Sequence, residues 1–172
     1  MSRLTTLSLE HATDTTRPLL EGVQKKIGFL PNVFKTLAHA PAVLASYLQQ
    51  SATLGKTSLS ATEKETIFLA TSQVNGCDYC LAAHTLFAGK AGLSAQDILS
   101  ARQGQLDAYA ALARQITESR GHLSSEQIEA ARAAGINDSK IIEVIAHVAS
   151  QTLTNYLNNV ALTDIDFPAI DA

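Results

Sequence analysis

Clusters of charge and long apolar runs are missing from this 172-residue sequence. Charged residues make up only 17% of the chain, and the formal net charge is −3. Lysine and arginine are scattered, so the sequence predicts neither a nucleic-acid partner nor an anionic membrane surface. No stretch approaches the roughly 20 apolar residues of a membrane span, and the first residues lack a signal-peptide core. We therefore expect a soluble, cytoplasmic protein.

Cysteine is equally scarce, since only Cys77 and Cys80 occur. A chain of this length can bury a hydrophobic core without disulfide staples, and its 46% of apolar residues suits a globular domain. In a reducing compartment, two cysteines so closely spaced indicate redox chemistry or metal binding rather than a structural crosslink.

Strand signals are nearly absent, whereas helix signals recur along the chain. Ser60 with Glu63, and Ser124 with Gln127, have the spacing of capping boxes that begin helices. The sequence therefore predicts an all-α fold, a multi-helix bundle in one domain over residues 1–172, with an N-terminal arm at 1–17 and a C-terminal tail at 164–172. The expected helices span residues 18–27, 32–39, 41–54, 61–75, 77–91, 94–102, 106–120, 124–134 and 138–162, and the last could kink or break near 152–154.

A faint internal repeat aligns Glu65–Gln73 with Glu143–Gln151 without gaps. Continuing the same register places Asn155 opposite Cys77 and Asn158 opposite Cys80. Two interpretations stay open: chance likeness between helical segments, or a duplicated helical hairpin whose second copy lost its cysteines.

The most informative segment runs from Glu65 to His84. Asn75-Gly76 predicts a helix stop, so Cys77 would fall in the first turn of a new helix, where the helix dipole favours a thiolate. Cys77 and Cys80 are three residues apart on one helical face, within disulfide range. His84 follows Cys80 by four residues on that face, and a histidine beside a thiol is a common way to make a nucleophilic thiolate.

Glu65 lies in the preceding helix, 11 residues before Gly76, while His84 lies 8 residues after it. These separations correspond to about 16 Å and about 12 Å of helix. If the two helices fold back on each other, the carboxylate comes level with the imidazole to within about one turn. It could then orient the ring, as the third group of a triad does.

The composite pattern of Glu65, eleven residues, Cys77-x-x-Cys80, three residues and His84 resembles the core of alkylhydroperoxidase D, within the carboxymuconolactone decarboxylase superfamily. The resemblance covers roughly residues 20–165. The segments Gly28–Phe34 and Thr154–Asn158 look like the flanking segments of the peroxidase-related branch.

The resemblance implies an all-α fold with a central helical hairpin, a homo-oligomer, and reduction of a hydroperoxide substrate by the cysteine pair. It further implies that Cys80 attacks the peroxide and Cys77 resolves, with His84 and Glu65 as a proton relay and an unidentified dithiol or protein as reductant. One position departs from the best-known branch, which has a second histidine where this chain has Tyr79. A tyrosine could relay a proton, although its ordinary pKa near 10 makes it a poor base.

Several alternatives remain beside this interpretation. A zinc site is disfavoured, because the two cysteines and His84 supply at most three ligands from adjacent turns; we expect no metal and no cofactor. The cysteines could instead be a buried, inert pair, and Tyr79 could serve packing alone. At the level of function, a lactone decarboxylase or a non-enzymatic redox sensor competes with a peroxidase. We expect no role for the other histidines, His11, His39, His122 and His147.

Overall fold

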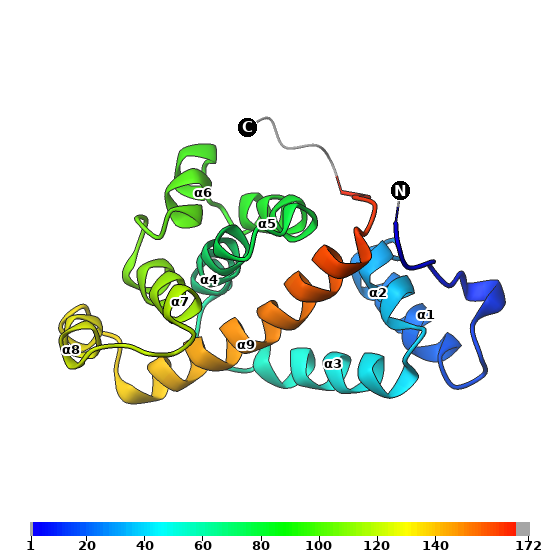
Figure 1. Cartoon of the computed structure of the whole chain (residues 1–172), viewed down its shortest axis with the longest axis horizontal. Coiled ribbons are helices and arrows are strands. Elements are labelled where there is room, and N and C mark those ends of the chain that lie inside the picture. Colours follow the sequence, from blue (N-terminus) through cyan, green and yellow to red (C-terminus); the bar gives the residue numbers. More distant parts are fainter. Residues whose placement is uncertain (1, 168–172) are drawn as a thin grey trace.

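The computed structural model describes residues 2–167, and within that range its regular elements are all helices (Figure 1), which confirms the all-α prediction. None of the described helices is both long enough and apolar enough to cross a membrane. The elements are a 3-10 helix, η1 (Leu9–His11), followed by α1 (Arg17–Ile27), α2 (Asn32–Leu37), α3 (Pro41–Leu54), α4 (Ala61–Val74), α5 (Asp78–Lys90), α6 (Ala95–Arg102), α7 (Ala108–Ser119), α8 (Ser125–Ala133) and α9 (Asp138–Ala161).

Capping boxes begin three of these helices, including the two that the sequence predicted. At the start of α4, Ser60 Oγ accepts a hydrogen bond from the Glu63 amide at 3.1 Å, and Glu63 Oε2 accepts one from the Ser60 amide at 2.6 Å. The same reciprocal pair begins α6 and α8. Each box satisfies amides that a helix otherwise leaves without partners. The predicted boundaries therefore hold to within a few residues.

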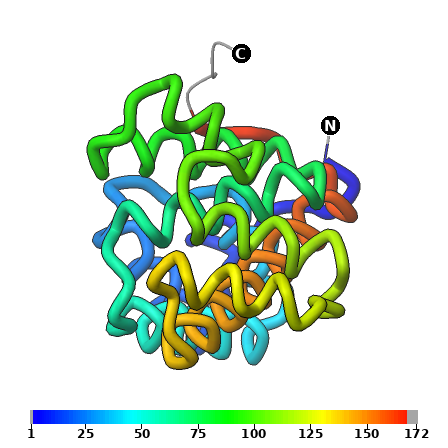
Figure 2. Tube along the Cα trace, turned by 90° about the vertical axis from the view of Figure 1, so that its left-hand side faces the viewer, coloured from blue at the N-terminus to red at the C-terminus, as the bar shows by residue number. Residues whose placement is uncertain are grey.

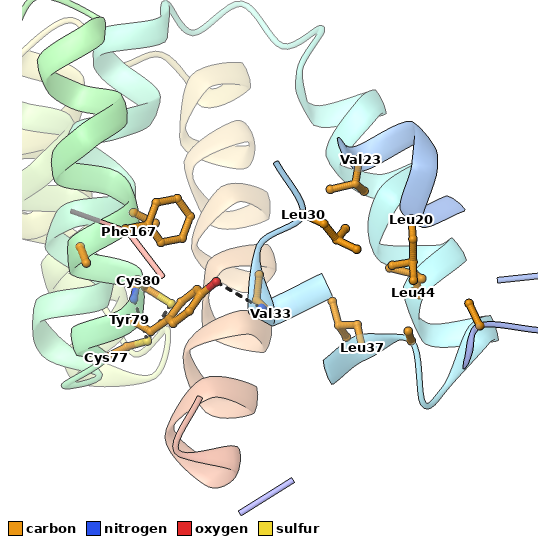
Figure 3. Packing of buried hydrophobic residues seen from close by; sticks show 14 residues of the cluster. Leu20, Val23, Leu30, Val33, Leu37, Leu44, Cys77, Tyr79, Cys80 and Phe167 are labelled. Atoms are coloured by element: carbon orange, nitrogen blue, oxygen red, sulfur yellow. Dashed lines mark hydrogen bonds between the residues drawn. The ribbon is translucent and has the colours of Figure 1, made fainter. Parts of the chain in front are cut away.

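Helix α4 is the central element, because it contacts α5, α6, α7 and α9 (Figures 1 and 2). Its buried side chains point in several directions: Ile67 and Ala70 join a core formed with α7 and α9, while Leu69 joins a core beneath α5 and α6. A helix that is apolar on more than one face must be surrounded by others. A further core fills the space between α1, α2, α3 and α5, and both cysteines belong to it (Figure 3).

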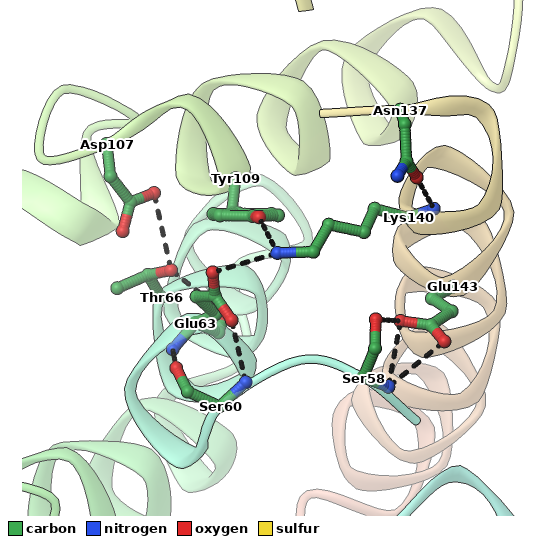
Figure 4. A network of polar contacts seen from close by, with 9 residues as sticks. All are labelled: Ser58, Ser60, Glu63, Thr66, Asp107, Tyr109, Asn137, Lys140 and Glu143. Carbon is green, nitrogen blue, oxygen red and sulfur yellow. Dashed lines mark hydrogen bonds and ion pairs between the residues drawn. The ribbon is translucent and has the colours of Figure 1, made fainter. Parts of the chain in front are cut away.

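A polar network ties the beginning of α4 to α9 (Figure 4). The Lys140 ammonium donates to the Tyr109 hydroxyl at 2.6 Å and lies 3.4 Å from Glu63 Oε1. One turn further along α9, the Glu143 carboxylate accepts hydrogen bonds from the amide and the hydroxyl of Ser58. The network fixes the position of α4, on which Glu65 lies.

The expected break in the last helix is wrong, because α9 runs without interruption from Asp138 to Ala161. The two threonines that suggested it are accommodated inside the helix: Thr152 donates to the Val148 carbonyl and Thr154 to the Gln151 carbonyl. The hypothesis of a duplicated hairpin loses its support for the same reason. Where α4 ends and turns, α9 continues straight through Asn155 and Asn158.

Both ends of the described chain pack against the helices. Arg17 is the first residue of α1, and its guanidinium donates hydrogen bonds to the carbonyls of Leu9 and Ala12. These bonds hold η1 in place. At the other end, Asp166 accepts a hydrogen bond from the Asn32 amide at 2.7 Å, and Phe167 is buried in the core that contains the cysteines. The remainder of the expected tail, 168–172, lies outside the described residues.

Candidate functional site

The turn between α4 and α5 is built by Asn75 and Gly76. Gly76 has φ of +60°, a left-handed conformation that glycine adopts without strain. The Gly76 amide bonds the Gln73 carbonyl, and the Cys77 amide bonds the Ser72 carbonyl at 3.0 Å. These two bonds form a Schellman motif, which ends α4 and delivers Cys77 to the start of α5. Cys77 is the N-cap of α5 rather than a residue of its first turn, and its sulfur accepts a hydrogen bond from the Cys80 amide at 3.3 Å.

The two cysteines are free thiols with their sulfur atoms 2.7 Å apart, and both are buried. The pKa of Cys77 is raised well above its usual value, chiefly by the hydrogen bond that its thiol shares with Cys80 and then by burial. The pKa of Cys80 is lowered, chiefly by that same hydrogen bond. When the pair has lost one of its two protons, the remaining proton therefore lies on Cys77, and Cys80 is the thiolate. Helix-dipole reasoning alone favours the opposite assignment.

Asn158 of α9 contributes a second hydrogen bond to this thiolate. Its Nδ2 donates to Cys80 Sγ at 3.3 Å, which helps to lower the pKa of Cys80. The side chain is 4% exposed, and its Oδ1 has no hydrogen-bond partner within residues 2–167. Asn155, one turn earlier, donates to Ser72 Oγ at 3.1 Å. Sequence reasoning did not assign Asn158 a role, although the repeat register had placed it opposite Cys80.

His84 and Glu65 meet as the hairpin geometry predicts. His84 Nδ1 lies 2.8 Å from Glu65 Oε2, and both side chains are largely buried, with 16% and 15% exposure. The Phe68 ring packs against the imidazole with centroids 4.8 Å apart. Because Nδ1 faces the carboxylate, Nε2 is the nitrogen left for chemistry. Within the described residues no hydrogen bond joins His84 directly to Cys80; instead the two side chains line the same cavity.

That cavity has a volume of about 110 Å³ and is mostly apolar. Tyr47 also lines it, and burial raises the pKa of Tyr47 to about 12, so its phenol stays protonated at neutral pH. Asn158 and Thr154 of α9 complete its polar lining together with Tyr47, His84 and the sulfur. The apolar lining consists of Ile27, Pro31, Val33, Phe34, Ala83, Phe87 and Phe167, with the ring of Tyr79.

Tyr79, the residue between the cysteines, is tied to the chain's last described segment. Its hydroxyl donates to Asp166 Oδ1 at 2.8 Å. It also accepts from the Val33 amide at 3.2 Å, a bond that Figure 3 shows. Burial, above all, raises the pKa of Tyr79, which makes it still poorer as a base. Its ring lies 5.5 Å from that of Phe167 in an edge-to-face contact. These contacts fix Tyr79 in the lining of the cavity. Sequence reasoning had not predicted that Phe167 and Asp166 contact it.

A second cavity of about 240 Å³ lies on the other side of Tyr47 and His84, which line both spaces. Lys64 and His147 face it, and burial lowers the pKa of His147 to about 4. His147 is 3% exposed and its Nε2 lies 3.1 Å from Thr57 Oγ1. In the described part of the chain, no three His, Cys, Asp or Glu side chains converge on a point where they could hold a metal ion.

Comparisons with known proteins indicate the family and the fold. Residues 39–119, which contain α4, the cysteines and His84, match the carboxymuconolactone decarboxylase family. A structure from Ralstonia eutropha JMP134, described as an alkylhydroperoxidase AhpD core and uncharacterized peroxidase-related protein, is 26% identical with a TM-score of 0.84, over 96% of this chain and 92% of that one. A peroxidase-related protein from Silicibacter sp. TM1040 is 23% identical with a TM-score of 0.79, over 95% and 94%.

The fold also occurs in a protein with a different activity. The debrominase Bmp8, in a variant bound to 2,3,4-tribromopyrrole, is 20% identical with a TM-score of 0.80, covering 96% of this chain and 92% of that one. A search of curated proteins gave no match. Residues 39–119 therefore belong to the carboxymuconolactone decarboxylase family, and the described chain has the all-helical fold of the AhpD-like structure.

Proposed function

We propose that the protein is a thiol-dependent peroxidase that reduces small, apolar hydroperoxides through Cys80 and Cys77. The observation that carries the proposal is the environment of Cys80: a buried sulfur whose pKa is lowered by Cys77 and Asn158, in a cavity that it shares with His84. The thiolate is the nucleophilic form of cysteine, so a lowered pKa provides it at neutral pH.

In the first step, the Cys80 thiolate attacks the terminal oxygen of the hydroperoxide and the O–O bond breaks. The sulfur becomes a sulfenic acid, and the departing alkoxide takes a proton from protonated His84 to leave as an alcohol. Glu65 supports this step, since its carboxylate contacts Nδ1 and orients Nε2 towards the cavity. Asn158 Oδ1, which has no hydrogen-bond partner among residues 2–167, can accept the hydrogen bond of the peroxide O–H and orient the terminal oxygen towards the sulfur.

In the second step, Cys77 attacks the sulfenic acid, and the two sulfurs form a disulfide with loss of water. The 2.7 Å separation of the sulfur atoms supports this, because the side chains need to move very little. A supplied dithiol then reduces the disulfide and becomes a disulfide itself. Of its two protons, one restores the Cys77 thiol and the other returns to His84, which leaves Cys80 as the thiolate.

The cavity's lining favours an organic hydroperoxide over hydrogen peroxide. About 110 Å³ bordered largely by aliphatic and aromatic side chains provides room for a compact apolar group beside Cys80. Removing such a group from water is favourable by roughly 25 cal/mol per Å² of apolar surface. A small alkyl or aryl hydroperoxide would gain that contribution and hydrogen peroxide would not.

The test is stopped-flow oxidation of the reduced protein by hydrogen peroxide, tert-butyl hydroperoxide and cumene hydroperoxide, followed by turnover with a supplied dithiol. We expect faster oxidation by an organic peroxide, with loss of both thiols in each cycle. Oxidation no faster than that of free cysteine would refute a peroxidase. Stoichiometric oxidation without dithiol-supported turnover would indicate a redox sensor, and decarboxylation of a muconolactone by the Cys77→Ser/Cys80→Ser protein would indicate a lactone decarboxylase.

A further inference from the structure

The second cavity, beyond Tyr47 and His84, has positive charge at its border. Lys26, near the end of α1, and Lys64, in the first half of α4, both line it, and none of its described lining residues is acidic. The fold therefore gathers two ammonium groups from distant parts of the chain around a space of about 240 Å³. A hollow that is bordered by cations and by no anion attracts a negatively charged group.

Both ammonium groups can still bind a ligand. Lys64 Nζ donates to the Gly55 carbonyl at 3.0 Å, which leaves it further N–H groups to donate. In the part of the chain that the structure describes, neither Lys26 nor Lys64 pairs with a carboxylate. Ser51 and Ser150 also line the cavity and add hydroxyl groups to its border.

Two glutamates near the cavity bind other partners. The Glu65 carboxylate contacts Nδ1 of His84, and Glu143 accepts hydrogen bonds from the segment before α4. Neither of them lines the cavity. His147 does line it but is neutral at pH 7, because burial above all, and then the charge of Lys64, lower its pKa to about 4. The charge at the border of this cavity is therefore that of the lysines, and no lining carboxylate cancels it.

The second cavity continues the one that Cys80 lines. Two side chains, one from α3 and one from α5, line both spaces. On α1, Ile27 lines the first space and its neighbour Lys26 lines the second. On α9, Thr154 lines the first and Gln151, about one turn earlier, lines the second. The same helices therefore border both spaces in succession.

Only a short ligand is needed to span the two spaces. Gln151, in the second, and Asn158, which bonds the Cys80 sulfur, are about 10 Å apart along α9. We propose that the second cavity binds the carboxylate of the hydroperoxide substrate, whose peroxide group lies beside Cys80 and whose apolar body fills the first cavity. This inference rests on the proposed peroxidase function and narrows its substrates to organic hydroperoxides that have a carboxylate beyond the apolar group.

The first experiment measures oxidation of the reduced protein by stopped flow, without a dithiol. The probes are cumene hydroperoxides with a carboxylate or a carboxamide at the para position of the ring, and each rate constant is divided by that for free cysteine. The two probes have similar shapes, so the ratio of their rate constants reports the charge. We expect the carboxylate to react about tenfold faster, and high salt to reduce this preference. A ratio of one or less would overturn the proposal.

Replacing each lysine tests whether the preference arises in the cavity. Lys26→Met and Lys64→Met should each lower the ratio about threefold to fivefold, as expected for a partly exposed ion pair. Lys64→Arg keeps the charge and should retain most of the preference. Lys25→Met is the matched control, because Lys25 precedes Lys26 on α1, is exposed and does not line the cavity. An equal fall in Lys25→Met would show general attraction by the charge of the protein and would refute a site.

The second experiment separates the carboxylate site from the peroxidase. Calorimetry follows binding of 4-isopropylbenzoate, which has the skeleton of the charged probe but no peroxide. We expect saturable binding that is weaker in Lys64→Met and much weaker for 4-isopropylbenzamide. Binding without oxidation faster than that of free cysteine would support the carboxylate site and refute the peroxidase. Fast oxidation by both probes, with no binding of the benzoate, would refute the site and leave the peroxidase standing. Equally strong competition by acetate would reveal a site for any small anion and would also overturn the proposal.

Discussion

Asn158 and Cys80, which lie 78 positions apart in the sequence, are joined by a buried hydrogen bond of 3.3 Å from Nδ2 to Sγ. A hydrogen bond to a charged group contributes about 1.5–3 kcal/mol, and most of it is lost when the sulfur is protonated. Asn158→Ala should therefore raise the pKa of Cys80 by about one unit or more. The pH dependence of alkylation by iodoacetamide measures this pKa.

Asn159→Ala is the control for that experiment. Asn159 is the next residue on α9 and donates to the Asn75 carbonyl at 2.8 Å instead of to a sulfur. Its replacement should leave the alkylation profile unchanged. If both variants shift the profile equally, Asn158 acts through the packing of α9 and not through its hydrogen bond.

The two thiols should respond differently to replacement. Cys77→Ser leaves Cys80 able to attack a hydroperoxide but removes the resolving thiol, so a sulfenic acid should accumulate on Cys80. Cys80→Ser should give none, because the Cys77 sulfur is buried, and burial by itself raises the pKa of Cys77. Labelling with dimedone, followed by mass spectrometry, locates the sulfenic acid. Its presence on Cys77 alone would reverse the roles.

Glu65→Gln tests whether the carboxylate sets the state of His84. The replacement keeps the shape of the side chain but removes the charge 2.8 Å from Nδ1. Oxidation by hydroperoxide should be slower at pH 7, and the difference should shrink at higher pH, where Cys80 ionises unaided. A pH–rate profile of both proteins measures the effect. Profiles that superimpose would assign Glu65 a purely structural role.

Tyr79→Phe should show whether the Tyr79 hydroxyl stabilises the fold or takes part in the reaction. The change leaves the Val33 amide and the Asp166 carboxylate without the hydroxyl that joins them. A buried group that loses its partner costs about 1–3 kcal/mol, so the urea midpoint should fall accordingly. If the hydroxyl relays no proton, oxidation of Cys80 in the folded protein should change less than twofold. A large kinetic loss without a loss of stability would make Tyr79 part of the relay.

His147 should make the protein less stable in mild acid. Its pKa is lowered to about 4 in the folded state, against about 6.5 in an unfolded chain. Between these values the unfolded state binds a proton that the folded state does not, so stability is complete above pH 6.5 and declines as the pH falls towards 4. The full effect is up to about 3 kcal/mol. Urea unfolding at pH 7 and pH 4.5 measures it, and His147→Gln should flatten the dependence.

Local signals in the sequence predicted the helices well, because capping boxes and glycine stops act within a few residues. They also predicted the meeting of Glu65 with His84, since a tight turn at Gly76 fixes how two helices align. Contacts between distant segments were beyond such reasoning. The repeat register set Asn158 opposite Cys80 but did not predict a contact between them, and no local pattern near Phe167 indicates that the segment after α9 packs against the cysteines. The threonines that suggested a broken helix turned out to bond within it.

The position of Cys77 at the beginning of α5 has an electrochemical consequence. Its sulfur accepts the Cys80 amide, its thiol bonds Cys80, and Asn158 bonds Cys80 in turn. All three contacts belong to the reduced pair, and a disulfide, being a weaker acceptor without a thiol proton, keeps at most part of them. They therefore stabilise the dithiol relative to the disulfide and raise the reduction potential, by about 30 mV for each 1.4 kcal/mol. The Cys77 sulfur, which caps α5, thus helps to determine which dithiols can reduce the Cys77–Cys80 disulfide.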